Sequence, residues 1–314
     1  MLDPQAARLL EARAEMNLKP FAACTVEEAR AALAARMPVS DLPIHSVRDE
    51  HVAGPAGDIP VRLYVPSETL PLPAVVYLHG GGWAVGSVET YDAVCRRLAH
   101  AAGCIVVSVD YRLAPEHKFP AGLEDAYAAA AWVVQHGADW GVDNGRVAVA
   151  GDSAGGALAT VVCQMARDRS GPQFVLQLLI YPNTDYEFER PSMIECGRGY
   201  TISVDDMHWF WGHYLNDAGD LDNPYVVPMR AESLSGLPPA LIISAGYDFL
   251  RDEDEAYGRK LADDGVRATM TRYPGMIHGF FGMGGILDEA DVALAEVAHA
   301  LRRAFRFARA AVVA

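Results

Sequence analysis

The sequence predicts an α/β protein with a mostly parallel central sheet that is flanked by helices. Short, almost wholly apolar runs recur along the chain, and stretches with helical periodicity separate them. Strands that are buried on both faces have this composition, because helices cover both sides of a parallel sheet. We therefore expect strands at residues 74–78, 104–109, 146–150, 174–180, 240–245 and, from a weaker pattern, 268–273.

The first part of the chain predicts helices followed by a hairpin. Within residues 1–40 apolar side chains recur at helical spacing, and Thr25 with Glu28 resembles a capping box at a helix start. Residues 45–65 alternate between apolar and polar side chains on both sides of a Gly-Pro-Ala-Gly turn at residues 54–57. This pattern indicates two antiparallel strands that precede the parallel part of the sheet.

One interval departs from the alternation of strand and helix. Residues 185–236 contain an aromatic-dense helical segment at residues 207–211 and then a loop. An aromatic-rich insertion between two strands is typical of a cap over a site, so we expect residues 185–236 to form a cap. Because the chain has no linker, repeat or low-complexity tract, we expect a single domain over residues 1–314, closed by an amphipathic helix at 288–310.

Composition narrows the classes of partner. The chain has 314 residues, of which 51% are hydrophobic, and its 26 Lys+Arg against 41 Asp+Glu give a net charge of −15. Such an acidic excess argues against binding to nucleic acid or to an anionic membrane surface. No apolar run approaches the ~20 residues of a membrane-spanning helix, and the N-terminus does not resemble a secretory signal. Five dispersed cysteines favour free thiols over a disulfide framework or a zinc site, so we expect a cytoplasmic protein without a metal.

A serine in a glycine-rich turn is the candidate nucleophile. Residues 151–155 read Gly-Asp-Ser-Ala-Gly and fit the motif G-x-S-x-G, with an apolar run before them and a helical stretch after them. Strand, tight turn and helix are the context in which this motif presents a nucleophile above a sheet. We therefore predict that Ser153 projects at a helix N-terminus, where partial positive charge favours a developing oxyanion.

A second glycine-rich segment predicts an oxyanion hole. His79-Gly80-Gly81-Gly82 directly follows the apolar run at 74–78. Three glycines allow the backbone to approach a substrate and to turn its N–H groups toward one point. We assign the amides of Gly81 and Gly82 to the oxyanion hole, with Ala154 as the third donor. A phosphate-binding loop would need a following Gly-Lys-Ser/Thr, which is absent, and His79 is interpreted as structural.

The base and the acid should follow Ser153 in the order acid, then histidine. Four histidines lie beyond Ser153; two belong to the aromatic insertion and one to the terminal helix, which leaves His278 in the loop after the last strand. Asp248 follows the run at 240–245 and therefore lies at the carboxyl edge of the sheet, where open α/β sheets build their sites. The rival acids at 252–255 are better explained as favourable charges at a helix start. We predict that Asp248 orients His278 and that His278 takes the proton from Ser153.

Together these elements resemble the bacterial hormone-sensitive-lipase-like carboxylesterases of the α/β-hydrolase superfamily. The resemblance spans roughly residues 75 to 281, and at the position after the acid this chain has Phe249 where the family commonly has proline. It implies an α/β-hydrolase fold with a helical cap from residues 1–40 and 185–236. It also implies hydrolysis of short- to medium-chain esters without a cofactor. The matching segments are residues 79–82, 110–116 with 119–121, 151–155, 248–253 and 278–280.

The nature of the substrate is less constrained than the chemistry. Trp83, Trp209, Phe249 and Phe280 are candidate walls of an acyl or alcohol pocket, although aromatic residues are also ordinary core. Since the assigned oxyanion donors are backbone amides, with no Lys or Arg beside the nucleophile in sequence, we expect neutral esters as small-molecule substrates. Arg112 and Asp152 are interpreted as structural.

Other readings of the same site stay open. An amidase, formamidase or lactonase would use the same residues, and a non-catalytic small-molecule receptor on this fold would lack the histidine that is intact here as His278. A long-chain lipase is disfavoured by the absence of a large apolar segment in the expected cap. The resemblance implies a homodimer through the last strand, here the weak strand at 268–273, which carries Met270 and exposed-looking threonines.

Overall fold

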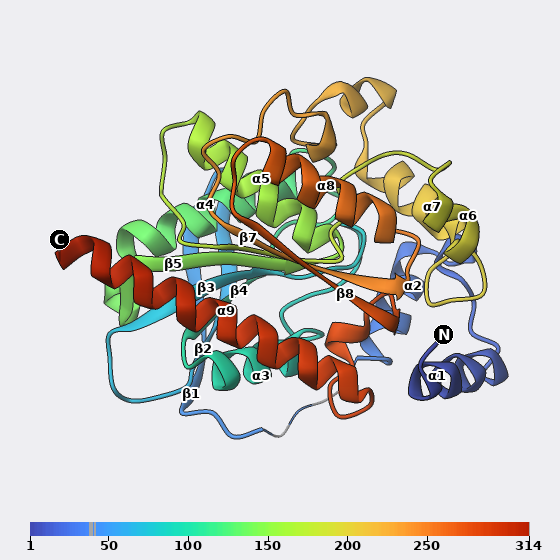
Figure 1. Ribbon diagram of the computed structural model, residues 1–314, viewed down its shortest axis with the longest axis horizontal. Coiled ribbons are helices and arrows are strands. Elements are labelled where there is room, and N and C mark those ends of the chain that lie inside the picture. The colour runs from blue at the N-terminus through green and yellow to red at the C-terminus, as the bar shows by residue number, and fades with distance from the viewer. Residues whose placement is uncertain (38–39, 41, 314) are drawn as a thin grey trace.

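The computed structural model describes residues 1–37, 40 and 42–313, and it shows an eight-stranded sheet between two layers of helices (Figure 1). The strand order is β1-β2-β4-β3-β5-β6-β7-β8. The hairpin of β1 and β2 is antiparallel and joins β4 antiparallel, whereas all other neighbours are parallel. The strands are β1 Ser46–Gly54, β2 Gly57–Val65, β3 Leu72–Leu78, β4 Ile105–Val109, β5 Val142–Asp152, β6 Gln177–Ile180, β7 Ala240–Tyr247 and β8 Ala268–Ile277.

The predicted fold class, hairpin and parallel strands are confirmed, although several strands differ in length. β5 begins at Val142 and ends at Asp152, and β8 continues to Ile277. The run at 174–180 forms a strand only from Gln177, because the chain bends at Val175 before it enters the sheet. Phe174 and Leu176 are nevertheless buried, so these apolar side chains serve the core rather than the sheet ladder.

Successive apolar side chains of a strand point to opposite faces of the sheet, which explains why helices cover both faces. On β3, Val76 and Leu78 point into the core that α4 and α5 cover, whereas Val75 and Tyr77 point into the core beneath α3 and α9. Figure 1 shows α3 and α9 on one face of the sheet and α4, α5 and α8 on the other. Their bounds are α3 Asp92–Ala102, α4 Ala121–His136, α5 Ala154–Asp168, α8 Arg251–Asp263 and α9 Asp288–Val313.

The two regions expected to form a cap lie at the same end of the molecule (Figure 1). The ring of Phe21 lies 5.2 Å from that of Phe210, and the Ala22 amide donates to Asp206 Oδ1 at 2.8 Å. Thr25 and Glu28 form the predicted capping box. The elements are α1 Pro4–Glu15, η1 Phe21–Ala23, α2 Val26–Ala34, α6 Pro191–Cys196, α7 Val204–Tyr214, η3 Ala218–Asp222 and η4 Pro228–Arg230; η2 Gly137–Trp140 and η5 Phe280–Gly282 are short turns elsewhere. Among the described residues, no helix combines the length and apolar composition that a bilayer crossing requires.

Candidate active site

Ser153 occupies the sharp turn between β5 and α5. Its backbone has φ +54° and ψ −123°, a strained conformation for a side chain with a Cβ atom. The turn needs small neighbours: a Cβ added to Gly155 would lie 2.0 Å from the Leu78 carbonyl oxygen. The sequence therefore directs the hydroxyl of Ser153 out of the sheet at the N-terminus of α5, as the motif predicted.

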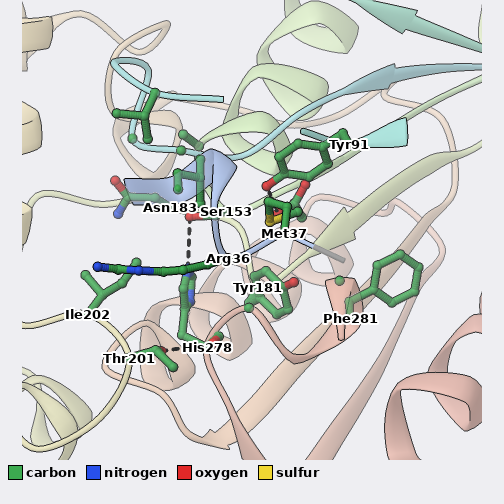
Figure 2. Close-up of a pocket in the computed structure, with 18 of the residues that line it drawn as sticks. Arg36, Met37, Tyr91, Ser153, Tyr181, Asn183, Thr201, Ile202, His278 and Phe281 are labelled. Carbon is green, nitrogen blue, oxygen red and sulfur yellow. Dashed lines mark hydrogen bonds between the residues drawn. The ribbon is translucent and has the colours of Figure 1, made fainter. Parts of the chain in front are cut away.

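The structure brings Ser153, His278 and Asp248 together in a hydrogen-bonded chain. His278 Nε2 lies 3.0 Å from Ser153 Oγ, and His278 Nδ1 lies 2.7 Å from Asp248 Oδ2. Figure 2 shows the first of these bonds as a dashed line between labelled residues. The second carboxylate oxygen of Asp248 accepts the Leu250 amide at 2.9 Å, and the His278 carbonyl accepts the Thr201 hydroxyl at 2.9 Å. These contacts fix the acid and the imidazole, so the arrangement can accept a proton from the serine.

The rival groups lie elsewhere. The run of acids at 252–255 does not bond His278; Asp252 instead accepts from the Ser192 amide, and Glu253 accepts from the Thr184 amide. His79 is buried and stacks on Tyr111 with ring centroids 4.3 Å apart, which supports the structural interpretation. Burial lowers the pKa of His79, so the ring is kept neutral inside the loop that it supports.

Three backbone amides lie free beside the serine. Among the described residues, the N–H groups of Gly81, Gly82 and Ala154 donate no hydrogen bond to a protein acceptor. Gly81 and Gly82 have φ values of +117° and +56°, and a residue with a Cβ atom would be strained in these conformations. All three residues line the same pocket as Ser153. Free amides at a helix start and a glycine loop are suited to hold a developing oxyanion.

Asp152 supports this loop from below. Its Oδ1 accepts the Tyr77 hydroxyl at 2.9 Å and the Gly80 amide at 3.1 Å, while its Oδ2 accepts the Tyr91 hydroxyl at 2.9 Å. Burial raises the pKa of the Asp152 carboxyl, and the bonds from the two tyrosines oppose that shift. The carboxyl thus connects the nucleophile turn to the oxyanion loop. Arg112, the other group interpreted as structural, forms a two-pronged ion pair with Asp125.

A pocket of about 140 Å³ lies above Ser153. Of the four predicted wall residues, Trp83 lines it, whereas Trp209, Phe249 and Phe280 do not. Phe249 and Phe280 are fully buried behind the triad, with Phe249 packed on the ring of His278 at 5.4 Å. Trp209 lies on a side of α7 that faces Phe21 and His213. The prediction that Trp209, Phe249 and Phe280 form walls of the pocket is therefore corrected.

Other side chains complete the pocket and were missed by sequence reasoning. Met207 and Phe210, three residues apart on α7, both line it, as helical spacing could have indicated. The N-terminal helices add Arg13, Arg36 and Met37. Figure 2 shows Arg36 and Met37 among the lining side chains, together with Tyr91, Tyr181 and Phe281.

Fold and site together define an α/β hydrolase with a serine positioned as a nucleophile. The model of a family described as alpha/beta hydrolase fold matches residues 75–282. The carboxylic ester hydrolase LipN of Mycobacterium tuberculosis is 48% identical over 249 residues, which are 76% of this chain and 66% of LipN. The ethyl acetate hydrolase of Pseudomonas putida is 39% identical over 269 residues, 84% of this chain and 82% of that enzyme.

The solved structures agree with this assignment. A hyperthermophilic esterase from the archaeon Pyrobaculum calidifontis has a TM-score of 0.90 at 44% identity and covers 96% of this chain and 98% of its own. The chain therefore belongs to the α/β-hydrolase superfamily, in the group of hormone-sensitive-lipase-like carboxylesterases that its motifs resemble.

Proposed function

We propose that the protein hydrolyses carboxylic esters of short to medium acyl chain through Ser153, His278 and Asp248. One observation carries the proposal: the hydrogen-bonded chain from Asp248 through His278 to the Ser153 hydroxyl, with bonds of 2.7 and 3.0 Å. The residues expected from sequence as catalytic thus lie within reach of one another. The relatives named as ester hydrolases support the choice of bond that is cleaved.

The geometry supports a two-step reaction. His278 Nε2 takes the proton as Ser153 Oγ attacks the ester carbonyl carbon, and the amides of Gly81, Gly82 and Ala154 stabilise the oxyanion. His278 then gives the proton to the departing alcohol, which leaves an acyl ester on Ser153. Water, deprotonated by the same imidazole, attacks this ester, and the proton returns to Ser153 Oγ as the acid departs. Asp248 holds the Nδ1–H tautomer and stabilises the imidazolium throughout.

The pocket supports a small, mainly apolar substrate. Its walls are predominantly apolar side chains, and the packed rings of Phe21 and Phe210 lie over the site from the two expected cap regions. We propose these regions, residues 1–40 and 185–236, as a cap on a single domain; residues 38, 39 and 41 lie outside the described part. Chain-length profiling from acetate to palmitate tests the expected acyl length, and a maximum at palmitate would refute it.

Ser153→Ala tests the mechanism. Turnover of p-nitrophenyl acetate should fall by about four to six orders of magnitude, because the covalent route is lost, while circular dichroism and the melting temperature stay unchanged. Ser235→Ala, at an exposed serine outside the pocket, is the matched control and should keep full activity. Retained turnover in the first variant would overturn the proposal.

We also propose a homodimer through β8. This strand is an edge of the sheet, and Met270 on it is 42% exposed. The unpaired backbone groups of an edge strand can pair with the same strand of a second copy. Light scattering at micromolar concentration should give twice the mass of the chain, and a monomer would refute the dimer.

A further inference from the structure

Two arginines of the N-terminal helical region line the pocket that contains Ser153. Arg13 lies in α1 and Arg36 follows α2, and both line this mainly apolar pocket. Figure 2 shows the Arg36 side chain extending across the view in front of the Ser153–His278 pair. Its guanidinium carbon lies 5.8 Å from the centre of the Phe21 ring, which helps to hold the side chain over the pocket.

Neither guanidinium has a counter-charge among the described residues. Each is partly buried, and neither forms a salt bridge or a hydrogen bond with another described residue. Arg36 Nε is buried and without a partner there. Every other arginine whose side chain the structure describes is either exposed or bonded to a carboxylate. Arg30, close by on α2, is an example: it holds Glu116 in a two-pronged pair and donates to the Ala84 carbonyl.

This lack of partners is unexpected in so acidic a chain. With 41 Asp+Glu against 26 Lys+Arg, carboxylates are abundant, yet none of the described ones lies against these two cations. Asp152 is the carboxylate among the residues that line the pocket, and its oxygens are already occupied by Tyr77, Tyr91 and the Gly80 amide. A protein cation that is withdrawn from water is costly unless an anion pairs with it.

The two arginines also repel one another. Burial lowers the pKa of Arg13, and the positive charge of Arg36 lowers it further, so the two side chains are close enough to interact. A ligand anion between them would relieve both the desolvation and the repulsion. Guanidinium groups match a carboxylate particularly well, since they can donate two parallel hydrogen bonds to it.

We propose that Arg13 and Arg36 form a subsite for a free carboxylate on the substrate, so that the enzyme favours esters which carry one over their neutral counterparts. The inference rests on the proposed ester hydrolysis, and it replaces the expectation of neutral esters that was drawn from the sequence alone. Two kinds of ester have this chemistry: half-esters of dicarboxylic acids, with the charge on the acyl side, and O-acetylated hydroxy acids, with the charge on the alcohol side.

The test compares charged and neutral partners of one ester. For the acyl side the pair is monoethyl glutarate and diethyl glutarate. For the alcohol side the pair is O-acetylmandelate and its methyl ester, and hydrolysis is measured as the release of acetate. In at least one pair the wild-type enzyme should favour the charged member in kcat/KM. Arg36→Gln and Arg13→Gln should each lower kcat/KM for that member by about 10- to 100-fold, mainly through KM, the loss that a charged hydrogen bond carries. For the neutral member the change should stay within about threefold, and Arg36→Lys should recover part of the loss.

Arg8→Gln is the matched control, because Arg8 is exposed on the same helix α1 and its loss changes the net charge equally. It should leave both substrates unaffected, which separates a local subsite from the overall field. Equal losses on charged and neutral esters, or a wild-type preference for the neutral member of both pairs, would overturn the inference. Failure of ester hydrolysis itself is distinguishable, since p-nitrophenyl acetate would then also resist the wild-type enzyme.

Discussion

Two substitutions of Asp152 distinguish its role in positioning the oxyanion loop from any role of its negative charge. The carboxyl is buried and holds three donors: Tyr77, Tyr91 and the Gly80 amide, which directly precedes the two oxyanion glycines. Asp152→Asn keeps Oδ1 for Tyr77 and Gly80, and the Tyr91 hydroxyl can turn to accept from the new amide. Asp152→Ala leaves all three donors buried without an acceptor, each at about 1–3 kcal/mol.

The two variants should therefore behave differently. Asp152→Ala should destabilise the fold by about 3 kcal/mol or more, and kcat should fall by about 100- to 1000-fold as the oxyanion amides lose their position. In Asp152→Asn we expect a loss of kcat below about tenfold, because a neutral acceptor keeps the loop in place. The assays are steady-state hydrolysis of p-nitrophenyl acetate and urea unfolding. If Asp152→Asn lost as much kcat as Asp152→Ala, the negative charge rather than the loop position would be the important factor, and the reasoning would fail.

Three further changes test other parts of the account. Gly81→Ala would place a Cβ 2.1 Å from the Val85 carbonyl oxygen at φ +117°, so kcat should fall about 100-fold or more; unchanged kcat would remove Gly81 from the oxyanion hole. Asp248→Asn added to Ser153→Ala should lower kcat almost no further, because Ser153, His278 and Asp248 act as a unit. Additive losses of kcat in the double variant would contradict this. Burial raises the pKa of Glu253 to about 8, above its unfolded value, so its contribution to stability is present at low pH and lost as pH rises through 8. The melting temperature of Glu253→Gln minus that of the wild type should therefore increase by about 3 °C or more from pH 5 to pH 9. If this difference were the same at both pH values, the raised pKa of Glu253 would be refuted.

The features that were correctly predicted from the sequence are those that local backbone sterics determine. The Gly-Asp-Ser-Ala-Gly turn is imposed by sterics that only small residues satisfy, as the close approach of Gly155 to the Leu78 carbonyl shows. The side of a strand or helix on which a residue falls was harder to predict. Phe249 follows Asp248 and packs into the core behind the histidine. Trp209 precedes Phe210 on α7 but packs behind the lining residue Phe21 instead of lining the pocket itself.

Residues that reach the site through tertiary packing left no local signal. Arg13 and Arg36 come to Ser153 across more than a hundred residues of sequence, only because the N-terminal helices pack over the pocket. Nothing in their immediate neighbours distinguishes them from Arg30, which forms an ion pair instead. The role that we propose for them rests on their partial burial in the pocket and on the lack of a partner among the described residues.

The central claim is that Ser153 is a nucleophile activated by His278. Treatment with paraoxon followed by peptide mass spectrometry tests it most directly, because only an activated serine is phosphorylated stoichiometrically. We expect one diethylphosphoryl group per chain, located on Ser153, and labelling of His278→Ala slowed by at least about 1000-fold. Modification at another residue, or equal labelling in the His278 variant, would contradict the account.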